Sequence, residues 1–137
     1  MAEQDSEQTA IYQRIAGALF DSLPAGWTSV EVTVSMIHFA ARFECTCTTA
    51  DGARQSVEAP DELWDEFTRL RELTYVPDRG AWLVAVFRLD HEGRFSVDFD
   101  YDRKPNLVAV TDDDYLEDLE KYPRAPELIP DWYPSGS

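Results

Sequence analysis

Alternation of apolar and polar residues in three segments is the feature that most restricts the fold of this chain. Residues 30–36 alternate Val and Met with Glu, Thr and Ser, and residues 41–48 alternate apolar residues with Arg, Glu and Thr. In residues 95–101, Phe, Val, Phe and Tyr alternate with Ser, Asp and Asp. A period of two residues is typical of a half-buried strand. These segments therefore predict the strands of an antiparallel sheet.

Two further strands are predicted from turns and from a continuous apolar run. Ala50–Gly52 is a hairpin turn that leads into a short return strand at residues 54–57. Residues 81–87 are all apolar and lie between chain breakers, which predicts a central strand buried on both faces. Asp90–Gly93 forms the turn before the last strand.

Three helices are predicted around these strands. Apolar residues recur at helical spacing over residues 11–19, with Ser6 as a candidate cap, and Leu23–Gly26 ends that helix. Pro60 and the acids after it open a second helix that buries Leu63, Phe67 and Leu70. The acidic stretch 112–120 forms a short third helix, capped by Thr111.

This order of elements predicts an α+β fold in a single domain over residues 1–137. The expected architecture is an antiparallel sheet of about five strands packed by two main helices, with a short acidic C-terminal helix and a Pro-rich tail. Residues 1–7 are expected to fray, and residues 123–137 form the tail.

Charge restricts the class of partner. Twelve Lys and Arg stand against 27 Asp and Glu, a formal net charge of −15. Such a surface repels phosphate backbones and anionic membranes, so neither nucleic acid nor a membrane is an expected partner. The excess of acids is densest in the last third of the chain. A basic protein is the partner class that this charge leaves open.

The expected location is the cytoplasm. The N-terminus is acidic and polar, unlike a signal peptide, and no apolar run approaches the roughly 20 residues of a membrane span. Cys45 and Cys47 are two apart on the apolar side of a predicted strand, so we expect reduced core thiols. Zinc would need more ligands than these two and the only histidines, His38 and His91.

Asp98, Asp100 and Asp102 form the sharpest cluster of chemically capable side chains. Carboxylates on one strand face could coordinate Mg²⁺ or Ca²⁺, but one strand supplies few converging ligands. A solvated face that resists edge aggregation, or a protein contact, is the favoured interpretation. A Cys–His pair between the core cysteines and His38 is a weaker candidate, since buried cysteines are usually inert.

Trp132 and Tyr133 stand apart from the other aromatics because they lie in the Pro-rich tail. Either the tail folds back and docks them on the domain, or they are exposed anchors for a partner. Docking is the favoured alternative, because aromatic side chains have much area to bury.

The later strands resemble a known family. Gly80-Ala81-Trp82-Leu83, then residues 87–89 (Phe-Arg-Leu) and 93–102 (Gly-Arg-Phe-Ser-Val-Asp-Phe-Asp-Tyr-Asp), are similar to the YezG-like immunity (antitoxin) family. Leu23-Pro24 with Trp27, and Leu70-Arg71, also fit, so the resemblance covers about residues 10–133. It implies a small bacterial cytosolic α+β protein without catalytic activity that protects its producer from a polymorphic toxin, often a nuclease.

Charge and resemblance together predict an immunity protein that binds and neutralises a basic toxin domain by direct contact, with no cofactor, no metal and no enzymatic activity. An acidic inhibitor can occupy a basic cleft as a nucleic-acid mimic. The alternatives are an acidic interaction or regulatory module without a toxin and a metal-dependent hydrolase that uses the Asp98 strand. The candidate partner-binding residues are Asp98, Asp100, Asp102, Asp112, Asp113, Asp114, Glu117, Asp118, Trp132 and Tyr133.

Overall fold

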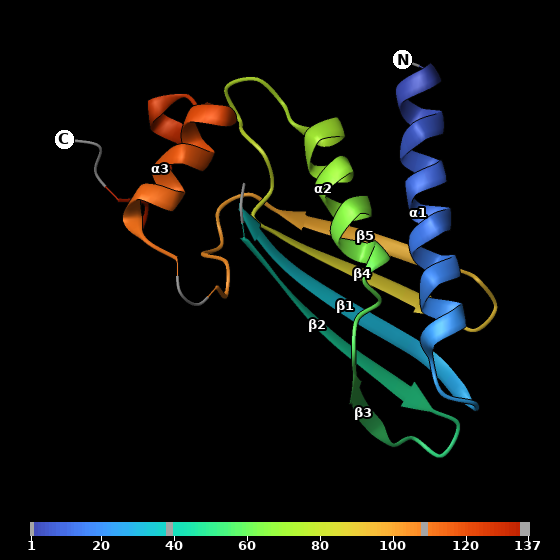
Figure 1. Cartoon of the computed structure of the whole chain (residues 1–137). Helices are drawn as coiled ribbons and strands as arrows, with labels where there is room; N and C mark the ends of the chain where they lie inside the picture. The colour runs from blue at the N-terminus through green and yellow to red at the C-terminus, as the bar shows by residue number, and fades with distance from the viewer. Residues whose placement is uncertain (1, 38–39, 108–109, 135–137) are drawn as a thin grey trace.

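A computed structural model describes residues 2–37, 40–107 and 110–134. Within these residues the chain forms three α-helices, five strands and one short 3₁₀ helix (Figure 1). In chain order they are α1 (Ala2–Ser22), β1 (Trp27–Ile37), β2 (Ala40–Thr49), β3 (Arg54–Val57), α2 (Glu62–Thr74), β4 (Val84–Asp90), β5 (Phe95–Asp100), α3 (Asp112–Lys121) and η1 (Pro126–Leu128).

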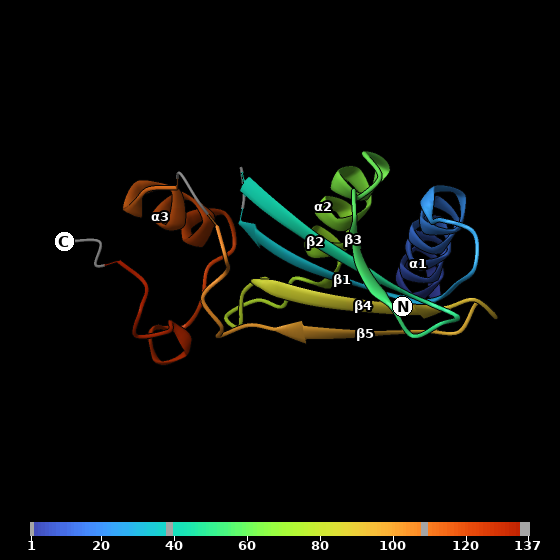
Figure 2. The same cartoon turned by 90° about the horizontal axis from the view of Figure 1, so that it is seen from below.

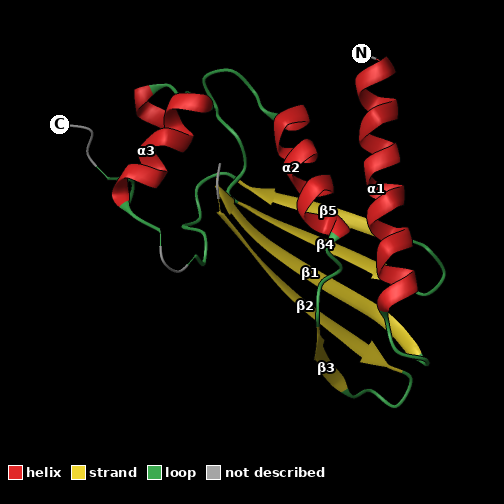
Figure 3. Cartoon of the chain, in the orientation of Figure 1, coloured by secondary structure: helices red, strands yellow, loops and turns green. Residues whose placement is uncertain are grey.

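All five strands belong to one antiparallel sheet in the order β3-β2-β1-β4-β5 (Figure 3). β1 is the central strand, and its Val32 pairs with Cys45 on one side and with Phe87 on the other. Hairpins join β1 to β2, β2 to β3 and β4 to β5, while α2 connects the two halves of the sheet. The predicted α+β class with a five-stranded antiparallel sheet is confirmed.

Helices α1 and α2 cover one face of the sheet and leave the other face open (Figure 2). The main core lies between them and the sheet, and its alternating strand residues follow the predicted pattern. Its fully enclosed large side chains include Ile11, Ile15, Leu63, Phe67 and Phe87.

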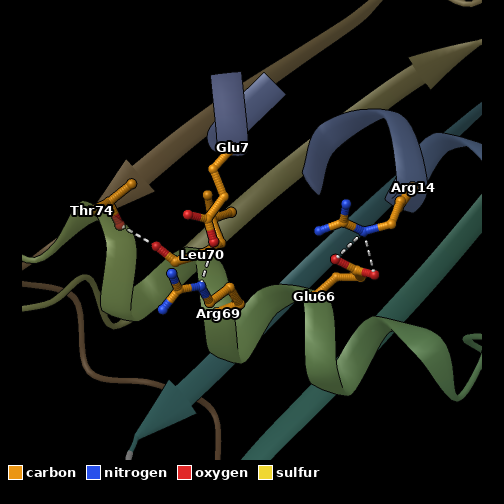
Figure 4. Close-up of polar contacts among 6 residues, drawn as sticks. All are labelled: Glu7, Arg14, Glu66, Arg69, Leu70 and Thr74. Atoms are coloured by element: carbon orange, nitrogen blue, oxygen red, sulfur yellow. Dashed lines mark hydrogen bonds and ion pairs between the residues drawn. The ribbon is translucent and has the colours of Figure 1, made fainter. Parts of the chain in front are cut away.

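Two ion pairs join the outer surfaces of α1 and α2 (Figure 4). Arg14 Nε donates to both carboxylate oxygens of Glu66 at 2.9 Å, and Arg69 Nε donates to Glu7 at 2.5 Å. Both arginines are exposed, so these pairs add little to the stability of the fold. In the structure α1 begins at Ala2, and Arg69 of α2 donates to Glu7, while fraying of residues 1–7 stays a prediction.

The apolar run 81–87 differs from its prediction in position. β4 begins only at Val84, three residues later than predicted, and it is an interior strand between β1 and β5. Ala81–Leu83 are buried because two cores meet there: Trp82 belongs to the main core and Leu83 to a second cluster. Farther along, Arg88 is exposed, so this part of β4 has one solvated face. The apolar run therefore predicted correctly that residues 81–83 are buried, but it did not predict where the strand begins.

The C-terminal part of the chain folds against the end of the sheet. Figures 1 and 2 show α3 beyond the end towards which β1 and β5 point. Ile37, Leu83, Tyr115 and Tyr133 form the buried second cluster at this junction. The segment from Pro123 to Pro134 is therefore part of the domain and not a free tail.

Candidate functional site

The acids of β5 lie on the open face of the sheet but do not converge. Arg88 Nη1 donates to Asp98 at 2.9 Å, and Arg88 Nε donates to Glu31 on β1 at 3.0 Å. These three side chains form an exposed row across β1, β4 and β5. Asp98 is therefore paired with a cation of its own chain.

Asp100 and Asp102 have different roles at the end of the strand. Asp100 Oδ1 accepts the backbone N–H groups of Asp102 and Arg103, at 3.0 and 2.9 Å, and so closes the turn after β5. The side chain of Asp102 is 83% exposed, and its nearest cation is Arg124, at 3.9 Å. Among the described residues no group of three or more His, Cys, Asp or Glu side chains is placed to hold a metal ion.

Helix α3 presents a second set of acids. Thr111 and Asp114 form the predicted cap as a reciprocal capping box, in which Asp114 N donates to Thr111 Oγ1 and Thr111 N donates to Asp114. Asp112 and Asp113 are exposed in the first turn, where the positive end of the helix dipole favours carboxylates. Glu117 is exposed one turn beyond Asp113, on the same side of the helix.

Asp118 is not on the surface, which corrects its assignment as a partner contact. Its carboxylate accepts two hydrogen bonds from Arg71 of α2, with Nη1–Oδ1 at 2.6 Å and Nη2–Oδ2 at 2.9 Å. Both residues are only 2% exposed. Neither can reach a partner without unfolding this junction.

Tyr133 and Trp132 dock on the domain, as the favoured alternative for the tail predicts. Tyr133 is buried and packs edge-on against Tyr115 of α3, so it is not an exposed anchor. Trp132 is half-buried against Tyr115, and its Nε1 donates to the backbone oxygen of Asp102 at 2.6 Å. Trp132 thereby ties the end of β5 to α3.

This contact joins the segment after β5 to α3, so the exposed acids of both parts lie at the same end of the molecule. We call Asp102, Asp112, Asp113 and Glu117 the acidic end surface. Each is exposed, and within the described part of the chain none has an ion pair shorter than 3.9 Å. The partner-binding prediction thus divides into this exposed set and six residues with internal contacts: Asp98, Asp100, Asp114, Asp118, Trp132 and Tyr133.

Sequence reasoning missed a polar depression on the open sheet face. It has a volume of about 410 Å³, and Arg54, Arg88 and Arg94 line it together with Glu31, Asp90 and several Ser and Thr hydroxyls. Arg88 is neutralised by Glu31 and Asp98, and Arg94 pairs with Asp90 and Glu92. The strand alternation places Arg54 and Arg88 on this face, so their positions could have been read from the sequence.

The cysteines face the core, as predicted, and both are free thiols. Burial raises the pKa of the Cys45 thiol to about 11, and the neighbouring Cys47 contributes to the rise. Cys45 is therefore a protonated core side chain at neutral pH, and not an activated nucleophile. His38, the proposed partner in a Cys–His pair, lies outside the described residues, and His91 is exposed in its turn.

No protein-family model and no curated protein matches this chain. The resemblance to the YezG-like immunity family therefore stays a prediction. No helix in the described part of the chain is long and apolar enough to cross a membrane.

Proposed function

We propose that this protein is an immunity protein that binds a basic toxin domain through the acidic end surface and blocks its active cleft. The observation that carries the proposal is the exposure of Asp112, Asp113 and Glu117 on α3, which lies beyond the end of the sheet where Asp102 follows β5, in a chain with a net charge of −15. A nuclease or another effector with a basic cleft has the complementary charge.

The framework beneath this surface favours recognition without rearrangement. The buried Arg71–Asp118 pair fixes α3 to α2, and Trp132 fixes α3 to the end of β5. Carboxylates held on rigid elements lose little conformational freedom on binding, so more of the electrostatic attraction contributes to affinity. Half-buried Trp132 borders the surface and supplies an aromatic contact.

The proposal assigns no catalytic residue and no cofactor, and it places the protein in the cytoplasm of the producing cell, where a toxin would meet its target. An acidic interaction module without a toxin is the alternative, and the two differ in whether the bound protein is toxic by itself. A hydrolase that uses the β5 acids predicts heat from Mg²⁺, Mn²⁺ or Ca²⁺ in titration calorimetry. No heat at millimolar ion would leave the hydrolase without support.

The test is the association rate of the basic protein that the wild-type chain captures from its host. Reversal of Asp112, Asp113 and Glu117 to Lys should lower that rate at least about tenfold at low ionic strength and flatten its salt dependence. Asp114 is left intact because it caps α3.

A matched control carries the same change of charge elsewhere. Asp21, Glu58 and Asp65 are exposed residues in or near α1 and α2, without ion pairs in the described structure. Their reversal to Lys should change the rate much less. Equal rates for the two triple variants would contradict a specific role for the acidic end surface.

A further inference from the structure

Within the described part of the chain, no strand pairs with the backbone groups on the outer edge of β5. β5 is the last strand of the sheet, and Asp90 N donates to Arg94 O at 2.9 Å where β4 turns into β5. Hydrogen-bonded pairs alternate along an antiparallel ladder, so residues 96, 98 and 100 also bond towards β4. The backbone N–H and C=O groups of Phe95, Val97 and Phe99 consequently point away from the sheet.

The side chains of this edge are only partly covered. Phe95 lies on the helix-covered face against Tyr12 and Phe87, yet it is 41% exposed. Val97 and Phe99 continue this apolar row and are half-buried. Exposed strand edges of this kind are templates for pairing with another strand.

The sequence of β5 is complementary to itself in an antiparallel arrangement centred on Val97. Position 94 then faces position 100 of the second strand, 95 faces 99, and 96 faces 98. Arg94 meets Asp100, Phe95 meets Phe99, and Ser96 meets Asp98. Every cross-strand pair is thus either opposite in charge, apolar, or a hydroxyl facing a carboxylate.

We propose that two copies of this chain pair through β5 about a two-fold axis at Val97, so that their sheets join edge to edge. In this register the outward groups of Phe95, Val97 and Phe99 form the new hydrogen bonds. Arg94 and Asp100 then form non-hydrogen-bonded pairs, in which opposing side chains lie closest. The contact is isologous, so each ion pair occurs twice.

Both charged partners are available for this contact. Among the described residues, Arg94 pairs with Asp90 and Glu92 in an exposed turn, and replacing such exposed ion pairs by a new one costs little free energy. Asp100 accepts through Oδ1 in the turn after β5, and no hydrogen bond from the described residues reaches Oδ2, which can accept from Arg94 of the second copy. The dimer contact is independent of the proposed toxin binding.

The test is a charge swap read by sedimentation equilibrium at one ionic strength. Arg94→Glu places like charges at both ends of the contact, and Asp100→Lys does the same, so each should raise the dimer dissociation constant about tenfold or more. In a mixture of the two variants, the introduced glutamate of one chain faces the introduced lysine of the other, and the remaining Arg94 faces the remaining Asp100. Dimers should therefore return in the mixture, a result that misfolded variants cannot give.

A backbone variant provides an independent test. Val97→Pro removes an outward N–H that the single chain does not use, so the melting temperature should change little while the dimer is lost. Ser56→Pro is the matched control on the opposite edge, because the pair Thr49 N to Ala53 O makes Ser56 outward-facing in β3. It should leave the dimer intact. A wild-type mass of one chain at all concentrations would overturn the proposal, as would a dimer that Val97→Pro leaves intact or a mixture without rescue.

Discussion

Arg71 of α2 and Asp118 of α3 form a bidentate ion pair that is closed to solvent. Arg71 Nε also donates to the backbone oxygen of Trp82 at 2.7 Å, and the guanidinium lies 5.0 Å from the centre of the Tyr122 ring. One side chain thus joins α2, α3 and the segment before β4. The position of the acidic helix depends on this pair.

Removal of one partner should destabilise the fold strongly. Asp118→Ala leaves the guanidinium of Arg71 buried without a counter-charge, and we expect a loss of about 3 to 5 kcal/mol in the free energy of unfolding. Urea denaturation followed by tryptophan fluorescence measures this loss.

The double variant separates charge from packing. Arg71→Met with Asp118→Leu removes both charges and keeps apolar volume, so it should recover most of the lost stability. A double variant as unstable as Asp118→Ala would show that the hydrogen bond to Trp82, and not the missing counter-charge, dominates.

Position 80 requires glycine because of its backbone conformation and because a side chain lies close to its Cα. Its φ is +94°, and a Cβ there would come within 2.6 Å of the Arg124 side chain, which is held by hydrogen bonds to Ala81 and Leu128. Gly80→Ala should therefore cost more than the roughly 1 to 2 kcal/mol of a left-handed backbone.

Thermal melting of the Gly80→Ala variant measures this cost, and Gly17→Ala is a control variant with an expected effect of opposite sign. Gly17 lies inside α1 with open space around it, so alanine should stabilise the protein by about 1 kcal/mol. Equal effects of the two substitutions would contradict the account of Gly80.

The cysteines should resist thiol reagents in the native protein. Because burial raises the pKa of Cys45 to about 11, little thiolate exists at pH 8, and Cys47 is also fully enclosed. A colorimetric disulfide reagent should react with both thiols only after addition of denaturant. Rapid reaction of the native protein would show that β2 opens to solvent as fast as the reagent reacts.

Alkaline pH should loosen the C-terminal junction. Burial raises the pKa of Tyr133 to about 12, with Asp118 adding to the shift, whereas an unfolded tyrosine titrates near 10. The protonated form is favoured in the folded state, so its contribution is complete below pH 10 and is lost as the pH rises towards 12.

Tyr133→Phe isolates this effect. From pH 10 to 12 the wild type should lose on the order of 2 kcal/mol relative to the variant, as measured by urea unfolding at each pH. Parallel stability curves would place the alkaline sensitivity in other tyrosines.

The strands were predictable because their periodicity is local. The alternation in residues 95–101 and the cap at Thr111 depend only on neighbours, and both occur as predicted. The burial of Asp118 could not be predicted from local patterns. Asp118 follows Tyr115 by three residues and lies on the buried side of α3. Its ion-pair partner, Arg71, is 47 residues away in the sequence. Composition predicted an acidic surface, but only the fold shows which acids form hydrogen bonds or ion pairs within the chain.

The most direct test of the account is bacterial growth with the captured basic protein expressed alone or together with this chain. We predict that the protein arrests growth alone, that the wild-type chain restores growth, and that the Asp112, Asp113 and Glu117 reversal to Lys restores it much less than the control reversal does. Absence of toxicity, or equal protection by both reversed chains, would contradict neutralisation through the acidic end surface.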